Sequence, residues 1–247
     1  EQAPKNTPSG VAIITQECIF GLPLVTMARM TVWGNAMKKF STKADSVFRY
    51  PFRSVLNALI FCLTLAISLY LAFAPLLKFQ KSNLWTTDGV NQHYPNLYFF
   101  HEWMSDFLAN ISQGPEQWSW SLGLGADVIS TLSWPIIGDP FALISIFFQA
   151  DRLETASVYM FFARLFAAGV ISYFLMRKIG ANALGATMGT LIYVFTAFTF
   201  FQTMKHAYFA NVLVFLPLVF WGIERLLRDR KPALLVMAVC LTAYSNF

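Results

Sequence analysis

The run SVLNALIFCLTLAISLYLAFAPLL, residues 54 to 77, contains no charged side chain. As an α-helix it is long enough to cross the roughly 30 Å of hydrocarbon in a lipid bilayer. It belongs to a chain of 247 residues that is 56% hydrophobic, 17% aromatic and only 13% charged. Such a composition is too apolar for an ordinary soluble domain. The sequence therefore predicts an integral membrane protein whose first span is residues 54–77.

Further apolar segments predict four more spans. They cover residues 156–176, 185–203, 210–227 and 233–247. The last segment is still apolar where the sequence stops, so we expect a piece of a longer polytopic protein, whose remaining helices would complete the packing. The predicted fold is an all-α helical bundle.

Lysine and arginine gather beside alternate ends of these spans, as they do in cytoplasmic loops. They are Lys38, Lys39, Lys43, Arg49 and Arg53 before the first span, Arg177 and Lys178 after the second, and Arg225, Arg228, Arg230 and Lys231 after the fourth. The loop at residues 78–155 instead carries eight acidic side chains and only three basic ones. We predict a multi-pass protein of the cell membrane, with a cytoplasmic N-terminus and a large external first loop.

The sequence before the first span divides near Met37, which begins a basic stretch typical of a natural start. We expect residues 1–36 to be a peripheral or extraneous segment, residues 37–53 a basic cytoplasmic flank, and residues 54–247 the membrane domain. The basic residues flank spans and form no nucleic-acid-binding motif, so no nucleic-acid partner is predicted. The three cysteines lie far apart and indicate neither a disulfide framework nor a zinc site.

Within the external loop, residues 95–112 carry apolar side chains at helical spacing but are too polar to span. We predict a helix on the membrane surface, beginning at Pro95. Glu102 and Asp106 share its opposite face and point towards water or a polar cleft. The apolar face consists of Leu97, Phe100, Met104, Phe107, Leu108 and Ile111. Beyond it come Trp118, Trp120 and Trp134, which suit either anchoring at the interface or contact with sugar faces.

Titratable residues gather directly after the first span. Asp88 and Gly89 on their own predict a turn. A second reading is a cluster of Asp88, His93, His101 and Glu102 around a divalent cation. Their spacing matches no strong metal motif, so the cofactor stays open.

Two cationic positions stand out among the spans. Lys205 and His206 occupy the short external turn between the third and fourth spans, where a lysine reaches lipid phosphates or simply contacts anionic lipid. Arg164 lies inside the second span, where an isolated charge is costly. It is open to three roles: binding a lipid phosphate, capping backbone carbonyls, or pairing with a loop acid or with helices beyond this sequence.

Four stretches together carry a resemblance to a known family. They are TTDGVNQHYP at 86–95, GPEQWSWSLGLGAD at 114–127, GDPF at 138–141 and HAYFANVLVFLPLVFWGIERLL from His206. The chain resembles the bacterial YfhO-type membrane proteins, which belong with the GT-C class of glycosyltransferases. The resemblance implies a GT-C-like bundle that transfers a sugar from a polyprenyl-phosphate carrier to a cell-envelope acceptor such as lipoteichoic acid. It also implies a partner enzyme that loads the carrier on the cytoplasmic side.

By that resemblance, Asp88 is the catalytic base. Sugar transfer from a lipid phosphate needs a carboxylate for the acceptor proton and a cation for the departing phosphate. The residues expected to bind substrate are Gln92, His93, Glu102, Arg164, Lys205 and His206. A transporter or flippase of lipid-linked sugars and a non-catalytic membrane scaffold remain alternatives, because an intramembrane arginine also suits a transport pathway.

Overall fold

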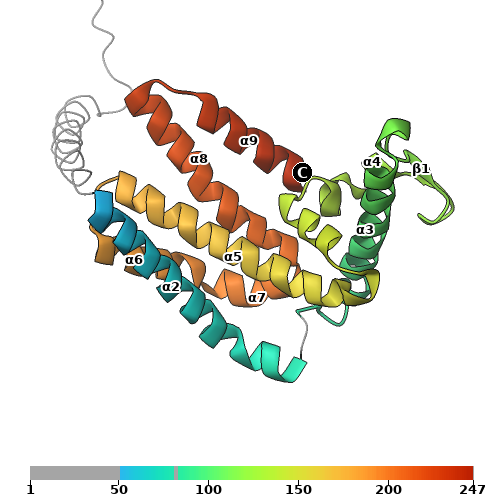
Figure 1. Cartoon of the computed structure of the whole chain (residues 1–247), viewed down its shortest axis with the longest axis horizontal. Helices are drawn as coiled ribbons and strands as arrows, with labels where there is room; N and C mark the ends of the chain where they lie inside the picture. The colour runs from blue at the N-terminus through green and yellow to red at the C-terminus, as the bar shows by residue number, and fades with distance from the viewer. Residues whose placement is uncertain (1–50, 81–82, 247) are drawn as a thin grey trace, which may run out of the picture.

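The structure, a computed structural model, describes residues 51–80 and 83–246. The predictions for residues 1–36 and for most of the basic flank lie outside the described residues. The described chain is mostly helical and forms an elongated bundle with a smaller segment at one end (Figure 1).

The bundle contains the helices that the apolar runs predicted. They are α2 (Pro51–Pro75, continued by a π-helical turn at Leu76–Gln80), α5 (Leu153–Lys178), α6 (Ala183–Val194), α7 (Ala197–Lys205), α8 (Ala210–Asp229) and α9 (Ala233–Asn246). By length and composition, three helices of the described chain can cross a membrane. The number rises to four if a bent pair of helices is counted as one span. The prediction of a polytopic, largely α-helical membrane protein is confirmed.

The span predicted at residues 185–203 is not one straight helix. It is the bent pair α6 and α7, which meet at an angle of 42°. The Thr196 hydroxyl accepts a hydrogen bond from Thr199 N at 3.4 Å, and the Thr199 hydroxyl donates to Val194 O at 2.5 Å. These side chains pair backbone groups that the break leaves free, which is required in a membrane interior. The break directs the end of α7, with Lys205, towards the segment between α2 and α5, which we call the external segment after its predicted location.

The core of the bundle is filled by large side chains that interlock between helices. Phe61 of α2 stacks on Tyr173 of α5 with ring centroids 4.1 Å apart, and Phe73 meets Phe161 edge to face at 5.1 Å. All four rings are buried. Close packing of this kind holds helices together in lipid, where the hydrophobic effect contributes little between them.

The external segment contains one longer helix, α3 (Tyr94–Ala109), preceded by a π-helical turn at Gly89–His93. A helix is therefore confirmed within the predicted residues 95–112, but α3 ends at Ala109, and helical structure begins before Pro95. The reason is local, because Tyr94 N donates to Gly89 O across the wide turn. Pro95 has no N–H to donate and so loses nothing in the first turn of α3.

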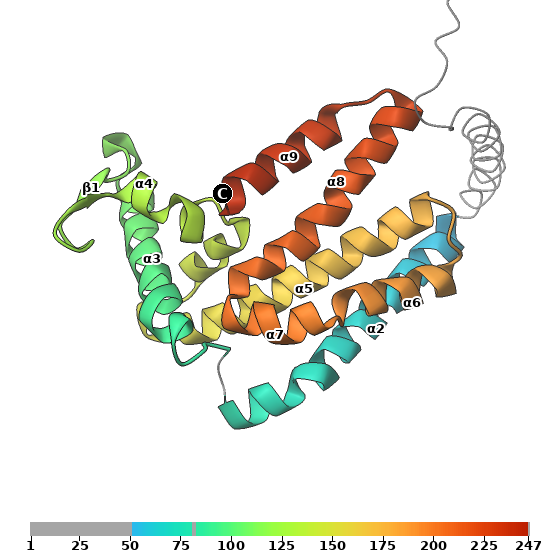
Figure 2. The same cartoon turned by 180° about the vertical axis from the view of Figure 1, so that it is seen from behind.

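The apolar face of α3 packs mainly against protein. Leu97, Phe100 and Trp103 are buried in a second core, together with side chains from residues 128–142 and from the first turns of α5. Trp103 Nε1 donates to Glu116 O at 2.7 Å. Only the end of the predicted face, Leu108 and Ile111, is exposed. Figures 1 and 2 show α3 at the end of the bundle, running across the direction of α5.

A short antiparallel hairpin departs from the all-α prediction. It pairs β1 (Trp118–Ser119) with β2 (Ala126–Asp127) and leads into α4 (Val128–Leu132). The remaining connections are 3₁₀ turns at Ile111–Gln113, Pro140–Phe147, Ala150–Arg152 and Ala207–Phe209, and a π-helical turn at Ser133–Ile137. The hairpin projects away from the bundle and exposes Trp118 and Trp120 (Figures 1 and 2).

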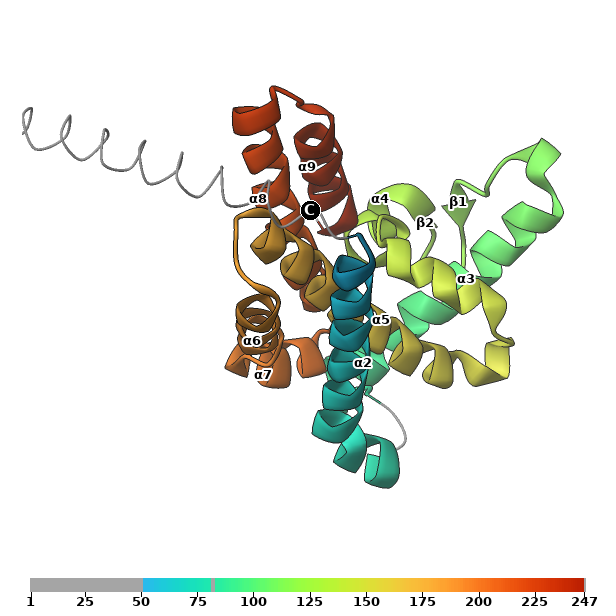
Figure 3. The same cartoon turned by 60° about the vertical axis from the view of Figure 1, so that its left-hand side comes forward.

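The two ends of the bundle differ in charge. The start of α5 and the end of α7 lie at the end that carries the external segment, which we call the cavity end (Figure 1). The ends of α5 and α8, which carry Arg177 and Arg228 in their last turns, lie at the opposite end, which we call the basic end. Figure 3 places α8 with α9 and α6 with α7 on the side of the bundle away from α3.

Candidate active site

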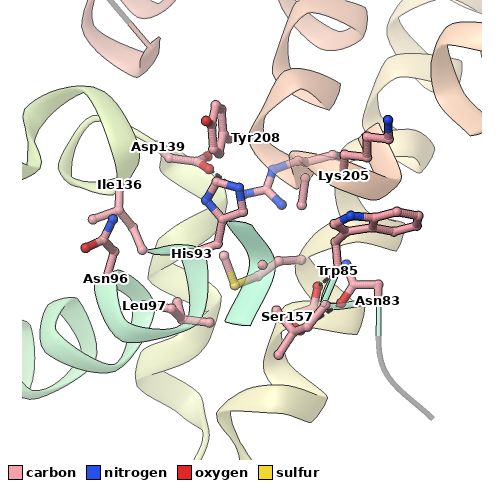
Figure 4. A pocket seen from close by; sticks show the side chains of 15 residues that line it. Asn83, Trp85, His93, Asn96, Leu97, Ile136, Asp139, Ser157, Lys205 and Tyr208 are labelled. Carbon is pink, nitrogen blue, oxygen red and sulfur yellow. Dashed lines mark hydrogen bonds and ion pairs between the residues drawn. The ribbon is translucent and has the colours of Figure 1, made fainter. Parts of the chain in front are cut away.

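A small polar cavity lies at the cavity end, between the external segment and the bundle. Its volume is about 50 Å³, enough for a few water molecules or a small polar group. Ser157, Met160 and Arg164 contribute one face of α5 to its wall. His93 enters from the turn before α3, and Lys205 comes from the end of α7. Figure 4 shows His93 in the middle of the surrounding side chains.

The inner wall of the cavity contains a buried ion pair. Arg164 Nη2 donates to Asp139 Oδ2, and both side chains are almost completely buried, at 3% and 1% exposure. Arg164 Nε donates to Asn211 Oδ1 at 3.0 Å, and its guanidinium carbon lies 5.5 Å from the centre of the Phe141 ring. Of the three roles left open by the sequence, Arg164 is therefore paired with a loop acid.

Asp139 belongs to the GDPF stretch, and sequence reasoning missed its role. Asp139 Oδ1 accepts a hydrogen bond from Phe141 N at 3.0 Å and so caps the following turn, in which Pro140 fits because it needs no N–H. A side chain at Gly138 would collide with Tyr244 O, because a Cβ there would lie only 1.8 Å away. Two features of the sequence could have identified this acid, namely the GDPF stretch itself and a lone arginine inside a span.

The same network continues into the last two helices. Asn211 of α8 is fully buried, and its Nδ2 donates to Ser245 Oγ of α9 at 3.0 Å. Through Asn211, Arg164 connects the external segment to α5, α8 and α9. A buried polar network with satisfied partners holds its members in one arrangement.

The outer edge of the cavity holds a different set of groups. His93 Nε2 and His206 Nδ1 lie 3.0 Å apart and share a hydrogen bond, although they are 113 residues apart in the sequence. On its other side, His206 Nε2 lies 3.6 Å from Asp88 Oδ2. The Asp88 side chain is 52% exposed and does not line the cavity. Asp88 is thus connected to the cavity through the two imidazoles.

The position of Asp88 depends on the glycine that follows it. Gly89 is buried, and a Cβ there would lie 3.0 Å from the carbonyl carbon of Leu84. Any larger residue would push this turn away from the preceding chain. The Asp-Gly pair therefore begins the helical turn that leads to His93.

Burial keeps the His93 imidazole neutral. Desolvation is the main cause that lowers the pKa of His93 from 6.5 to about 4, and the charges of His206 and Arg164 lower it further, while Asp88 raises it. At neutral pH His93 therefore has one ring nitrogen free to accept a proton or a hydrogen bond.

Lys205 is the exposed cation of the site. Its ammonium lies 5.7 Å from the centre of the Trp85 ring, and among the described residues it has no ion pair. A lysine without a carboxylate partner can bind an anion without first breaking a salt bridge.

Comparison with known proteins identifies the family of this chain. The sequence profile described as "Bacterial membrane protein YfhO" matches residues 59–247, which is most of the chain. The chain belongs to this YfhO family. It is also 27% identical over 101 residues to "Uncharacterized protein YfhO" of Bacillus subtilis (strain 168). That match covers 40% of this chain and 11% of the relative, so this chain corresponds to a small part of the relative's length. No solved structure shows a significant match.

The YfhO-family chain brings together some of the predicted site residues and separates others. His93, Arg164 and Lys205 line the cavity, while His206 connects His93 with Asp88. The other two predicted substrate-binding residues, Gln92 and Glu102, are exposed and do not line the cavity. Glu102 instead lies beside Tyr98 and raises the pKa of that phenol.

The four side chains considered for a divalent cation are not gathered in one place. His101 Nδ1 donates to Ser145 O at 3.1 Å in the core beneath α3. Within residues 51–80 and 83–246, no group of three His, Cys, Asp or Glu side chains has the arrangement of a metal site. The structure thus supplies an inner wall held by the Arg164–Asp139 ion pair and an outer edge with two histidines, an aspartate and a lysine.

Proposed function

We propose that the cavity end is the active site of a GT-C type membrane glycosyltransferase. In this proposal, a sugar moves from a polyprenyl-phosphate carrier to a cell-envelope acceptor such as lipoteichoic acid. The observation that carries the proposal is a cavity lined by Lys205, a cation with no ion pair among the described residues, and connected through His93 and His206 to the carboxylate of Asp88. These are the two kinds of group that the reaction requires.

Each group has one role in the transfer. The bond between the anomeric carbon and the phosphate oxygen breaks, and its electron pair stays on the phosphate. The acceptor oxygen forms the new bond to the anomeric carbon and loses its proton towards Asp88. Lys205 stabilises the negative charge that develops on the departing phosphate. Arg164 is neutralised by Asp139 and holds the wall in place.

The proposal places the cavity on the external side of the membrane. Its support is the arginine and lysine residues of the basic end, which are typical of the cytoplasmic side. The carrier is then loaded by a separate enzyme at the cytoplasmic face and reaches the cavity within the bilayer.

The proposed orientation is tested by single cysteines at positions 120 and 177, labelled in intact cells with an impermeant reagent. We expect labelling of Trp120→Cys and protection of Arg177→Cys. The reverse pattern would place the cavity in the cytoplasm and remove the external active site.

A flippase for lipid-linked sugars is the second candidate, because one observation favours it. The α6–α7 pair is bent by 42°, and interrupted helices of this kind form substrate sites in transporters. A flippase moves the intact donor between leaflets, whereas a transferase breaks the glycosyl bond.

This difference defines the experiment. The full-length protein is reconstituted in vesicles with polyprenyl-phosphate donors that carry a labelled sugar, together with purified envelope acceptors. The proposed function predicts that label appears on the acceptor and that free polyprenyl phosphate is released in equal amount. Label that changes leaflet while still attached to its lipid would instead establish the flippase.

A further inference from the structure

We infer that His93 takes the acceptor proton inside the cavity and that His206 passes it to Asp88 at the surface. This inference rests on the proposed function and deepens it, because it assigns the group that touches the acceptor. The three side chains form a continuous series, with 3.0 Å between His93 Nε2 and His206 Nδ1 and 3.6 Å between His206 Nε2 and Asp88 Oδ2.

The carboxylate determines which ring nitrogens carry protons. An ionised Asp88 only accepts hydrogen bonds, so the His206 nitrogen that faces it carries the proton. In the neutral form of His206, Nδ1 is then the acceptor, and His93 Nε2–H donates to it. By elimination, His93 Nδ1 holds a free lone pair, and among the described residues no hydrogen bond is made to it.

Position decides which of the three groups meets the substrate. His93 lines the cavity and Asp88 does not. Asp88 is half exposed, so a proton that arrives there is released to water. The low pKa of His93, about 4, favours the passing on of a proton over its retention. The charged and titratable groups around His93 are Asp88, Asp139, Arg164, Lys205, His206 and Tyr208.

The proton balance of the relay is simple. His93 Nδ1 gains the hydroxyl proton while Nε2 gives its own proton to His206 Nδ1. His206 Nε2 then gives its proton to Asp88, which loses it to water. The rings return to the starting tautomers by exchange with water. The distance of 3.6 Å to Asp88 has to shorten during the reaction, as hydrogen bonds of catalytic groups commonly do when substrate binds.

The first test replaces the middle of the relay in the full-length protein. We expect His206→Gln to lower kcat for sugar transfer about 10²-fold while the donor KM changes less than about threefold, because His206 does not touch the donor. Adding Asp88→Asn should cause little further loss, since both changes interrupt one path. The matched control is His101→Gln, which removes a histidine outside the cavity and should keep transfer near wild type.

Two results of this assay would overturn the relay. One is His206→Gln with normal kcat beside an inactive Asp88→Asn, which would mean that Asp88 acts directly and would leave the transferase proposal standing. The other is an additive loss in the double variant, which would show that the two residues act separately.

A second measurement needs no turnover. With ¹⁵N-labelled histidine in the full-length protein, the signals of His93 and His206 are assigned by their absence in the single glutamine variants. The relay predicts that His93 carries its proton on Nε2 at pH 7 and stays neutral down to about pH 4. Because Asp88 raises the pKa of His93, Asp88→Asn should lower it further. A proton on His93 Nδ1 would overturn the relay and leave the transferase proposal standing. An inactive wild-type protein would overturn the transferase proposal, and the relay with it, even if His93 carried its proton on Nε2.

Discussion

Arg164 and Lys205 are the two basic side chains of one cavity, and their surroundings are opposite. Arg164 is 3% exposed and is held by Asp139 and Asn211. Lys205 is exposed and, within the described residues, has no ion pair. A buried charge needs its partner to be tolerated at all, whereas an exposed one stays available for a ligand. The inner wall is therefore suited to fixing the cavity and the outer edge to chemistry.

Asp139 and Asp88 differ in burial and pairing in the same way as Arg164 and Lys205. Asp139 is 1% exposed, pairs with Arg164 and caps the turn at Phe141. Asp88 is 52% exposed and has only the longer contact to His206. Substitutions in the inner wall should therefore lower stability, and substitutions at the outer edge should lower activity.

The largest effect on stability is expected for Arg164→Leu. It leaves Asp139 buried without its cation, and breaking a buried pair in this way costs about 3–5 kcal/mol. We expect a lower unfolding temperature in detergent and poor recovery of folded protein. Adding Asp139→Asn should restore part of the loss, because the amide is neutral and can still cap the turn. An Arg164→Leu protein as stable as wild type would show that the inner wall does not stabilise the fold.

At the outer edge, Lys205→Gln should weaken donor binding and lower kcat for sugar transfer without unfolding the protein. Hydrogen bonds to charged groups contribute about 1.5–3 kcal/mol, so the donor KM should rise roughly tenfold to a hundredfold. Lys205→Arg keeps the charge and serves as the matched control. Unchanged donor KM and kcat in Lys205→Gln would show that the phosphate binds elsewhere.

The smallest effect is expected at the break between α6 and α7. Thr196→Ala removes the cap of α7 and should cost about 1 kcal/mol, seen as a small decrease in unfolding temperature. Thr187→Ala is the control, because its hydroxyl only bonds to Ala183 O within α6. Equal stability of the two variants would mean that Thr196 does not hold the break.

Much of the fold could be predicted because long apolar runs and helical spacing are local signals. The break in the third span could not, since Phe195 and Thr196 replace the proline or glycine that commonly marks one. The periodicity of apolar residues predicted the helix α3. It could not predict that the apolar face packs against protein, because a surface helix and a core helix have the same spacing of apolar residues.

The site was predictable in its residue types but not in its pairings. The position of Arg164 inside a span indicated that it needs an acidic partner. The sequence did not show which one, because Asp139 is one of several loop acids and lies 25 residues away. The contact between His93 and His206 joins two turns that only the folded bundle brings together. Gln92 and Glu102 were grouped with His93 by nearness in sequence, but neighbouring helical positions point in different directions.

The most direct measurement is the turnover of Asp88→Asn in the full-length protein, at saturating donor and acceptor and equal amounts of folded protein. Asparagine preserves size and most hydrogen bonds but cannot take a proton, so we expect an unchanged unfolding temperature and a rate lower by about 10² to 10⁴. The matched control, Glu116→Gln, makes the same chemical change at a solvent-exposed position outside the cavity and should transfer sugar normally. Near-normal turnover of Asp88→Asn would contradict the account.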